Sequence, residues 1–127
     1  MDWGWLFTSF EGRINRARFW AGVIILWLVS IIINLAIAEV FVTRYDPQQF
    51  FPTMAPLAWI VWLLAAVAIT YMSLAVFAKR WHDREKSGWW SLIILVPFIG
   101  SIWALVECGC LPGTEGPNRY GADPLAL

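Results

Sequence analysis

The side chains best suited to chemistry lie in one short segment, residues 79–86, where seven of eight positions are ionisable. His82 is the only histidine in the chain, and Asp83 follows it directly. A carboxylate can orient an imidazole and raise its basicity, as general acid–base catalysis requires. Neighbouring residues on a helix point in different directions, however, so we favour a structural role in which His82 and Asp83 tie a loop to the helix ends. No residue is assigned as catalytic.

Basic residues in this segment and in residues 13–18 are candidates for binding. Guanidinium and ammonium groups near one membrane surface can bind lipid phosphates or an acidic partner, each contributing ~1 kcal/mol near an anionic surface. The alternative is that they only anchor the helix ends at the interface. The candidate residues are Arg13, Arg16, Lys79, Arg80, His82, Asp83 and Arg84.

Other chemistries find no support in the sequence. One histidine with Cys108 and Cys110 supplies too few ligands for a metal site. The chain has no glycine-rich phosphate loop and no serine-hydrolase elbow. Its formal net charge is zero, so no overall field attracts nucleic acid. We therefore expect no metal, no cofactor and no nucleic-acid partner.

Three stretches of the chain contain no Asp, Glu, Lys, Arg or His, namely residues 19–38, 47–78 and 87–106. They predict the elements that position the candidate residues. Each has at least 20 residues, the number a helix needs to cross the ~30 Å hydrocarbon core of a bilayer. Charged residues make up only 14% of the chain, against about 25% in soluble domains. The sequence predicts an all-α integral membrane protein with three transmembrane helices.

The chain is short enough to form a single membrane domain over residues 1–127. Pro47 and Pro52 predict an extended connection, Pro56 a helix start, Ser87 an N-cap, and Pro97 a kink in the last helix. The expected segments are an interfacial segment at 1–16, helices at about 17–41, 56–78 and 88–107, and a turn-rich tail at 108–127.

The distribution of Lys and Arg predicts the orientation. With three crossings, seven of these residues fall on the side of the N-terminus and two, Arg44 and Arg119, on the other. Because cytoplasmic loops carry the excess of basic residues, the N-terminus should be cytoplasmic and the C-terminus periplasmic. Trp81 is one of six tryptophans expected in an interfacial belt on the basic side.

Polar residues inside the predicted spans are few. Asn34, Thr70 and Ser73 are expected to form hydrogen bonds between helices. No titratable group lies near the predicted midplane, which argues against an ion-coupled carrier.

Three motifs stand in order along the chain and are separated by hydrophobic spans: FEGRINR at 10–16, KRWHD at 79–83 and PGTEGPNRYGADP at 112–124. Together with the spans they extend over nearly the whole chain. With them the chain resembles the small bacterial inner-membrane proteins of the domain of unknown function 805 family. The resemblance implies a helical protein of the bacterial inner membrane without an established activity, and it adds Asn118, Tyr120 and Asp123 to the candidate binding residues. Trp81 departs from the pattern, because family members more often have leucine there.

Three functions are compatible with these features. We favour a non-enzymatic module or accessory subunit that binds membrane lipids, another membrane protein or a second copy of itself. The first alternative is an oligomeric channel or small carrier built around Asn34 and Thr70. The second is an enzyme of the headgroup layer that uses His82 and Asp83 as its acid–base pair.

Overall fold

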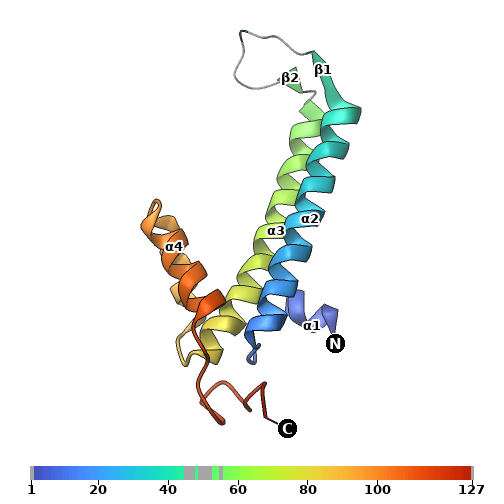
Figure 1. Ribbon diagram of the computed structural model, residues 1–127. Coiled ribbons are helices and arrows are strands. Elements are labelled where there is room, and N and C mark those ends of the chain that lie inside the picture. The colour runs from blue at the N-terminus through green and yellow to red at the C-terminus, as the bar shows by residue number, and fades with distance from the viewer. Residues whose placement is uncertain (1, 45–47, 49–52, 55, 127) are drawn as a thin grey trace.

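Two long antiparallel helices form the body of the molecule (Figure 1). The computed structural model describes residues 2–44, 48, 53–54 and 56–126. Helix α2 spans Arg16–Phe41 and helix α3 spans Pro56–Asp83, with 26 and 28 residues. At ~1.5 Å per residue each is about 40 Å long, enough to cross the ~30 Å hydrocarbon core. Pro56 begins α3 because its fixed φ suits the first helical position.

The surface of these helices is apolar. In the most hydrophobic window of each, only 17% of the residues in α2 and 11% in α3 are buried inside the protein. Leu35 and Leu64 are 65% and 66% exposed. A water-soluble protein rarely exposes so large an apolar patch, whereas hydrocarbon tolerates it. The predicted all-α membrane fold is therefore confirmed.

At their far end the two helices are joined through a short antiparallel pair of strands, β1 (Val42–Arg44) and β2 (Thr53–Met54). Val42 pairs with Met54 and Arg44 with Thr53. The extended conformation expected at Pro47 and Pro52 concerns residues outside the described part of the chain.

The segment expected to form a third continuous helix is divided in two. A 3-10 helix, η1 (Gly88–Leu95), is followed by α4 (Ile99–Leu105) and a π-helical turn, η2 (Val106–Cys110). Ser87 caps η1, as predicted, by accepting a hydrogen bond from the Trp89 amide. Pro97 has no amide hydrogen, and Phe98 has a φ of 61°, so the chain reverses here instead of bending.

The two arms of this hairpin are too short to cross a membrane. Eight residues of 3-10 helix rise about 16 Å, and the twelve residues from Ile99 to Cys110 rise about 18 Å. Gly100 allows the arms to touch, because a Cβ there would lie 1.7 Å from the Ile93 carbonyl oxygen. The chain therefore returns to the end from which it came, and both termini lie near the base of the two long helices (Figure 1).

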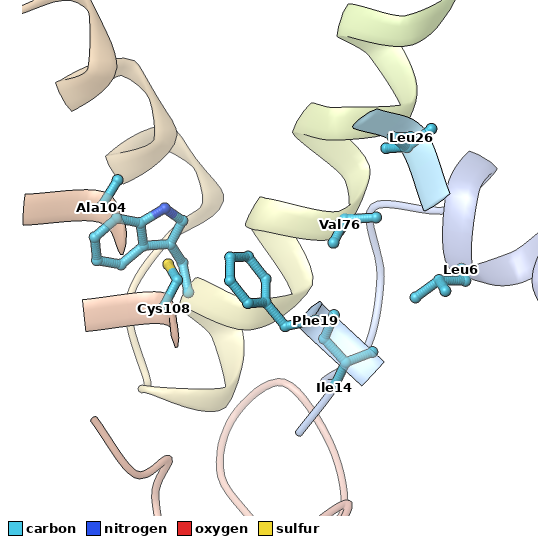
Figure 2. Packing of buried hydrophobic residues seen from close by; sticks show 8 residues of the cluster. Leu6, Ile14, Phe19, Leu26, Val76, Ala104 and Cys108 are labelled. Carbon is cyan, nitrogen blue, oxygen red and sulfur yellow. The ribbon is translucent and has the colours of Figure 1, made fainter. Parts of the chain in front are cut away.

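The buried apolar core lies at this same end. Figure 2 shows its side chains converging from α1 (Trp3–Thr8), the segment before α2, α2, α3 and the C-terminal helical turns. Leu6, Phe19 and Val76 are fully buried. Trp81 is also fully buried and lies 6.0 Å from the Trp90 ring, so its expected place in an interfacial belt is wrong. The core fixes α1 and the hairpin against the base of the two long helices.

Candidate functional site

Three buried charged residues from two distant parts of the sequence meet below the core, and we call Arg13, Arg80 and Asp83 the polar clamp. Arg13 is 5%, Arg80 0% and Asp83 4% exposed. The Asp83 carboxylate accepts from Arg13 Nε at 3.0 Å through Oδ1 and from Arg80 Nη1 through Oδ2. Arg13 Nη2 also lies 3.0 Å from Oδ1. One carboxylate thus bridges two guanidinium groups, a geometry in which charge-assisted hydrogen bonds are strong.

The remaining donors of Arg13 bind the C-terminal tail. Its Nη1 donates to the carbonyls of Gly116 at 2.8 Å and Gly121 at 3.2 Å, and its Nη2 donates to Thr114 at 2.7 Å. A guanidinium has five N–H groups, and in Arg13 four hydrogen bonds use them, one to Asp83 and three to the tail. Arg13 therefore fastens the start of the chain to residues more than 100 positions away.

Arg80 uses its donors in the same way on the turn that ends the hairpin. Its Nε donates to the Cys108 carbonyl and its Nη2 to the Leu111 carbonyl, each at 2.6 Å. The Asp83 carbonyl accepts from the Thr114 amide at 2.7 Å. Covered by the tail, Arg80 and Asp83 remain helical, which is why α3 extends to Asp83 and not only to the predicted end at residue 78.

Lys79 is fully buried and holds α1. Its ammonium donates to the backbone carbonyls of Trp5 at 3.1 Å, Leu6 at 2.7 Å and Ser9. It also lies 4.9 Å from the centroid of the Trp5 ring. Carbonyls at the end of a helix have no partner within the helix, and a cation stabilises them.

His82 contacts both the N-terminal segment and the tail. Its Nδ1 lies 3.0 Å from the Gly12 carbonyl oxygen, and its ring stacks on Tyr120 with centroids 3.9 Å apart and planes 5° apart. The Asn118 amide donates to the His82 carbonyl at 2.9 Å. Because Asp83 faces the two arginines, the structure gives His82 and Asp83 separate partners and forms no acid–base pair between them.

The tail is shaped by turns that the clamp requires. A Cβ at Gly113 would lie 1.9 Å from Asp83 Oδ2, so only glycine fits. Gly116 has a φ of 73° and donates its amide to Asp123 Oδ2 at 2.9 Å. The Leu125 amide donates to Asp123 Oδ1 at 2.9 Å, and these two hydrogen bonds lower the pKa of Asp123.

A second ionic group joins the turn after α3 to the hairpin and was not foreseen from the sequence. Glu107, 8% exposed, pairs with Lys86 and lies 3.7 Å from Arg84 Nη2. Arg84 also donates to the Pro112 carbonyl. The sequence did contain one signal, since Glu107 is the first carboxylate after the last apolar stretch. Glu107 can reach Lys86 and Arg84, however, only if the chain turns back to the clamp end.

The structure thus brings together most of the predicted site residues, but chiefly as internal contacts. Five of them form their hydrogen bonds with other groups of this chain, namely Arg13, Lys79, Arg80, Asp83 and Asn118. Arg16 is exposed, although it donates to the Cys110 carbonyl at 3.0 Å. Among the described residues, no group of three His, Cys, Asp or Glu side chains could hold a metal ion.

Comparisons with known proteins show which proteins this chain is similar to. The chain is 35% identical to inner membrane protein YhaI of Escherichia coli (strain K12) over 118 residues, which cover 93% of this chain and 87% of that protein. It is 29% identical to inner membrane protein YhaH of the same strain over 119 residues, covering 93% and 88%.

The uncharacterized protein YiiR of that strain is also similar, with 29% identity over 143 residues, which cover 94% of this chain and 87% of that protein. No solved structure matches the chain significantly. The family model described as "Protein of unknown function (DUF805)" matches residues 7–122. With the three motifs inside that range, the chain belongs to this family.

Proposed function

We propose that this chain is a non-enzymatic module of the bacterial inner membrane that binds anionic lipid headgroups on the cytoplasmic side. The proposal rests on one observation, that the charged residues of the chain fall into a buried, paired group and an exposed group. Those best placed for chemistry are buried and paired within the chain, whereas Arg16 and Arg119 remain exposed beside them. The relatives named as inner membrane proteins support the location.

The orientation follows from the hairpin. If residues 88–110 return to the side on which they enter, eight of the nine Lys and Arg residues lie at the clamp end and only Arg44 lies at the other. The positive-inside rule then favours a cytoplasmic clamp, with both termini in the cytoplasm. A fluorescent reporter that folds only in the cytoplasm should be active when fused after Leu127. A periplasmic enzyme reporter that is active there instead would refute this orientation.

The non-enzymatic character rests on the contacts of the titratable groups. Asp83 accepts from two arginines, and Lys79 donates to three carbonyls. A general acid or base must be able to reach a substrate proton, and groups held this way are not available. The clamp instead serves to hold α1, the two long helices, the hairpin and the tail in one arrangement.

The exposed arginines supply the binding surface. Arg119 stacks on Tyr120 at 4.9 Å, and its Nη2 donates to the Glu85 carbonyl at 3.3 Å, so its guanidinium is held in place yet open to solvent. Each such cation near an anionic leaflet contributes ~1 kcal/mol. A phosphate group is the natural ligand because a guanidinium binds it through two parallel hydrogen bonds.

Native mass spectrometry of the purified protein with equal amounts of phosphatidylserine and phosphatidylcholine tests the proposal. We expect the anionic lipid to be retained preferentially, and the Arg16→Gln, Arg119→Gln double variant to lose most of that preference. Arg44→Gln, at the opposite end, is the matched control and should keep it. Equal retention of the two lipids by the unmodified protein would refute headgroup binding.

A second candidate function, self-association in the membrane, is favoured by one groove. A cavity of about 220 Å³ between α2 and α3 is lined by Ser30, Asn34 and Thr70 among apolar residues. Asn34 accepts from Trp62 Nε1 at 3.2 Å and is exposed. Exposed polar side chains at membrane depth gain from a facing helix. Disulfide trapping of Ile33→Cys, which lines the same groove and leaves Asn34 in place, should give dimers in native membranes that the unmodified protein does not give, and monomers alone would exclude this interface.

A further inference from the structure

A cavity of about 340 Å³ lies beside the polar clamp, between the last turns of α3 and the beginning of η1. Leu74 and Ala78 of α3, Trp89 and Leu92 of η1, and Phe10 form its apolar walls. Trp89 is 79% exposed, so the cavity borders the apolar outer surface of the hairpin. Ser87 also lines it, and its side chain accepts from the Trp89 amide. Two further polar groups in the lining belong neither to this cap nor to the clamp.

The first polar group is the Ser91 hydroxyl. Ser91 is 3% exposed, and its Oγ has no hydrogen-bond partner among the described residues. Buried polar atoms are nearly always paired, so an orphaned hydroxyl on a cavity wall indicates a partner that enters the cavity. A hydroxyl can serve such a partner as donor and as acceptor.

The second polar group is the His82 ring. A carbonyl oxygen can only accept, so the 3.0 Å contact with the Gly12 carbonyl requires His82 Nδ1 to donate. In the neutral imidazole Nε2 is then an acceptor. A methyl group placed on Gly88 would lie 3.5 Å from this Nε2, and Gly88 lines the cavity. Besides the Ser87 hydroxyl that caps η1, the cavity thus offers one acceptor and one hydroxyl.

We propose that this cavity binds the free hydroxyl group of a diacylglycerol. The ligand hydroxyl would donate to His82 Nε2 and accept from Ser91, while the acyl chains follow Leu74 and Leu92 toward the hydrocarbon. A neutral lipid is indicated because the lining carries no Asp, Glu, Lys or Arg. None of the exposed arginines takes part, so the site is separate from the proposed phosphate-binding surface.

The depth of the cavity agrees with this ligand. Lys86, just before the cavity, pairs with Glu107 at the clamp end, and Leu92 lies further along η1 toward the apolar tip. The hydroxyl of a diacylglycerol sits directly on the glycerol backbone, at the boundary between headgroups and acyl chains. Within the cavity, His82 likewise lies toward the clamp end, and Leu74 and Leu92 lie further toward the apolar side.

The test uses the whole protein in nanodiscs and two probes, dioleoylglycerol and its 3-acetyl ester, which differ only at the hydroxyl group. Native mass spectrometry should show roughly five-fold greater retention of the free alcohol, the factor expected for one net hydrogen bond. Ser91→Ala should lower the retention of dioleoylglycerol severalfold without unfolding the protein, because it removes one of the two proposed partners of the alcohol, and the hydroxyl it deletes has no protein partner. Ser101→Ala, at an exposed serine of α4, is the matched control and should keep that retention.

Two results would overturn the inference. Equal retention of the two probes by the unmodified protein would exclude a hydroxyl-specific site, whatever its preference for phosphatidylserine. Retention of dioleoylglycerol that is the same in Ser91→Ala as in the unmodified protein, with thermal unfolding unchanged, would show that the alcohol binds elsewhere. Loss of the anionic-lipid preference alone would refute the proposed headgroup surface and leave this cavity unaffected.

Discussion

The two ends of the long helices differ in what they bury. At the clamp end, Lys79 and Arg80 are fully buried, while along the spans Ile32 and Leu35 are each 65% exposed. This protein buries charged side chains and exposes apolar ones, which is the reverse of the distribution in a water-soluble domain. In a bilayer this inversion is stable, because apolar side chains gain no more from one another than from lipid tails.

This difference between the clamp end and the spans shows which contacts determine the fold. Along the spans, α2 and α3 are joined by few polar contacts, among them the Asn34 to Trp62 hydrogen bond. At the clamp, hydrogen bonds with defined direction join four parts of the chain. Buried charged groups contribute to conformational specificity only while each one is paired. Once its partner is lost, a buried charge strongly lowers the free energy of unfolding. Changes at the clamp should therefore cost far more than changes along the spans.

The largest effect is expected for Asp83→Asn, which leaves Arg13 and Arg80 buried without their shared anion. Breaking a buried ion pair on one side typically costs about 3 to 5 kcal/mol, and here two cations lose their partner. We expect most of the stability of the clamp end to be lost. Thermal unfolding in detergent micelles measures this, with Glu85→Gln, at an exposed neighbouring carboxylate, as the control. An unfolding temperature equal to that of the control would contradict the importance of the clamp.

Gly113→Ala should have the next largest effect. The new methyl group would overlap Asp83 Oδ2 and displace either the tail or the carboxylate. Overpacking of this kind costs about 1 to 3 kcal/mol, and a 1.9 Å approach favours the upper end. Gly4→Ala is the control, because its nearest neighbour is the end of the flexible Asp2 side chain at 3.3 Å. Unfolding in the same micelles compares the two, and equal stability would refute the tight approach of the tail.

Much of the span architecture was accessible from the sequence. Charge-free stretches and Pro56 located α2 and α3, since length and hydropathy are local properties that a bilayer imposes. The third stretch is not the continuous helix that we expected, because hydropathy alone fits the same 20 apolar residues equally well to one long helix or to a hairpin. What decides between them is the reversal at Pro97 and Phe98 and the contact of Gly100 with Ile93, which composition does not reveal.

The site was predicted as a set of residues but not as a set of contacts. Arg13, Arg80 and Asp83 were named, yet their partners are mostly backbone carbonyls, and every residue has a carbonyl. No sequence pattern therefore points to Thr114, Gly116 or Cys108 as acceptors. Ser91 was also missed as a site residue, because its significance lies in the lack of a partner in the fold.

Lys79→Met should have a moderate effect, confined to α1. Methionine keeps the length of the side chain but removes the donor for the Trp5, Leu6 and Ser9 carbonyls. Hydrogen bonds to a charged group contribute about 1.5 to 3 kcal/mol, so α1 should detach before the long helices separate. Limited proteolysis near the N-terminus should become faster, whereas Lys86→Met should leave that rate unchanged. Unchanged cleavage in Lys79→Met would show that the core around Leu6 suffices to hold α1.

The smallest effect is expected at the exposed edge of the tail, where acid should loosen the Asp123 turn. The Gly116 and Leu125 amides lower the pKa of Asp123 below its ordinary value of 3.8. A carboxylate whose pKa is depressed by folding contributes stability that is present above its unfolded value and is lost as the pH falls through the folded value. Hydrogen exchange at the Gly116 and Leu125 amides should therefore distinguish the unmodified protein from Asp123→Asn at about pH 6, and the difference should shrink toward about pH 3. Glu115→Gln, at an exposed neighbour, is the control and should match the unmodified protein at every pH. If the exchange difference for Asp123→Asn does not change with pH, the charge of Asp123 does not stabilise the turn.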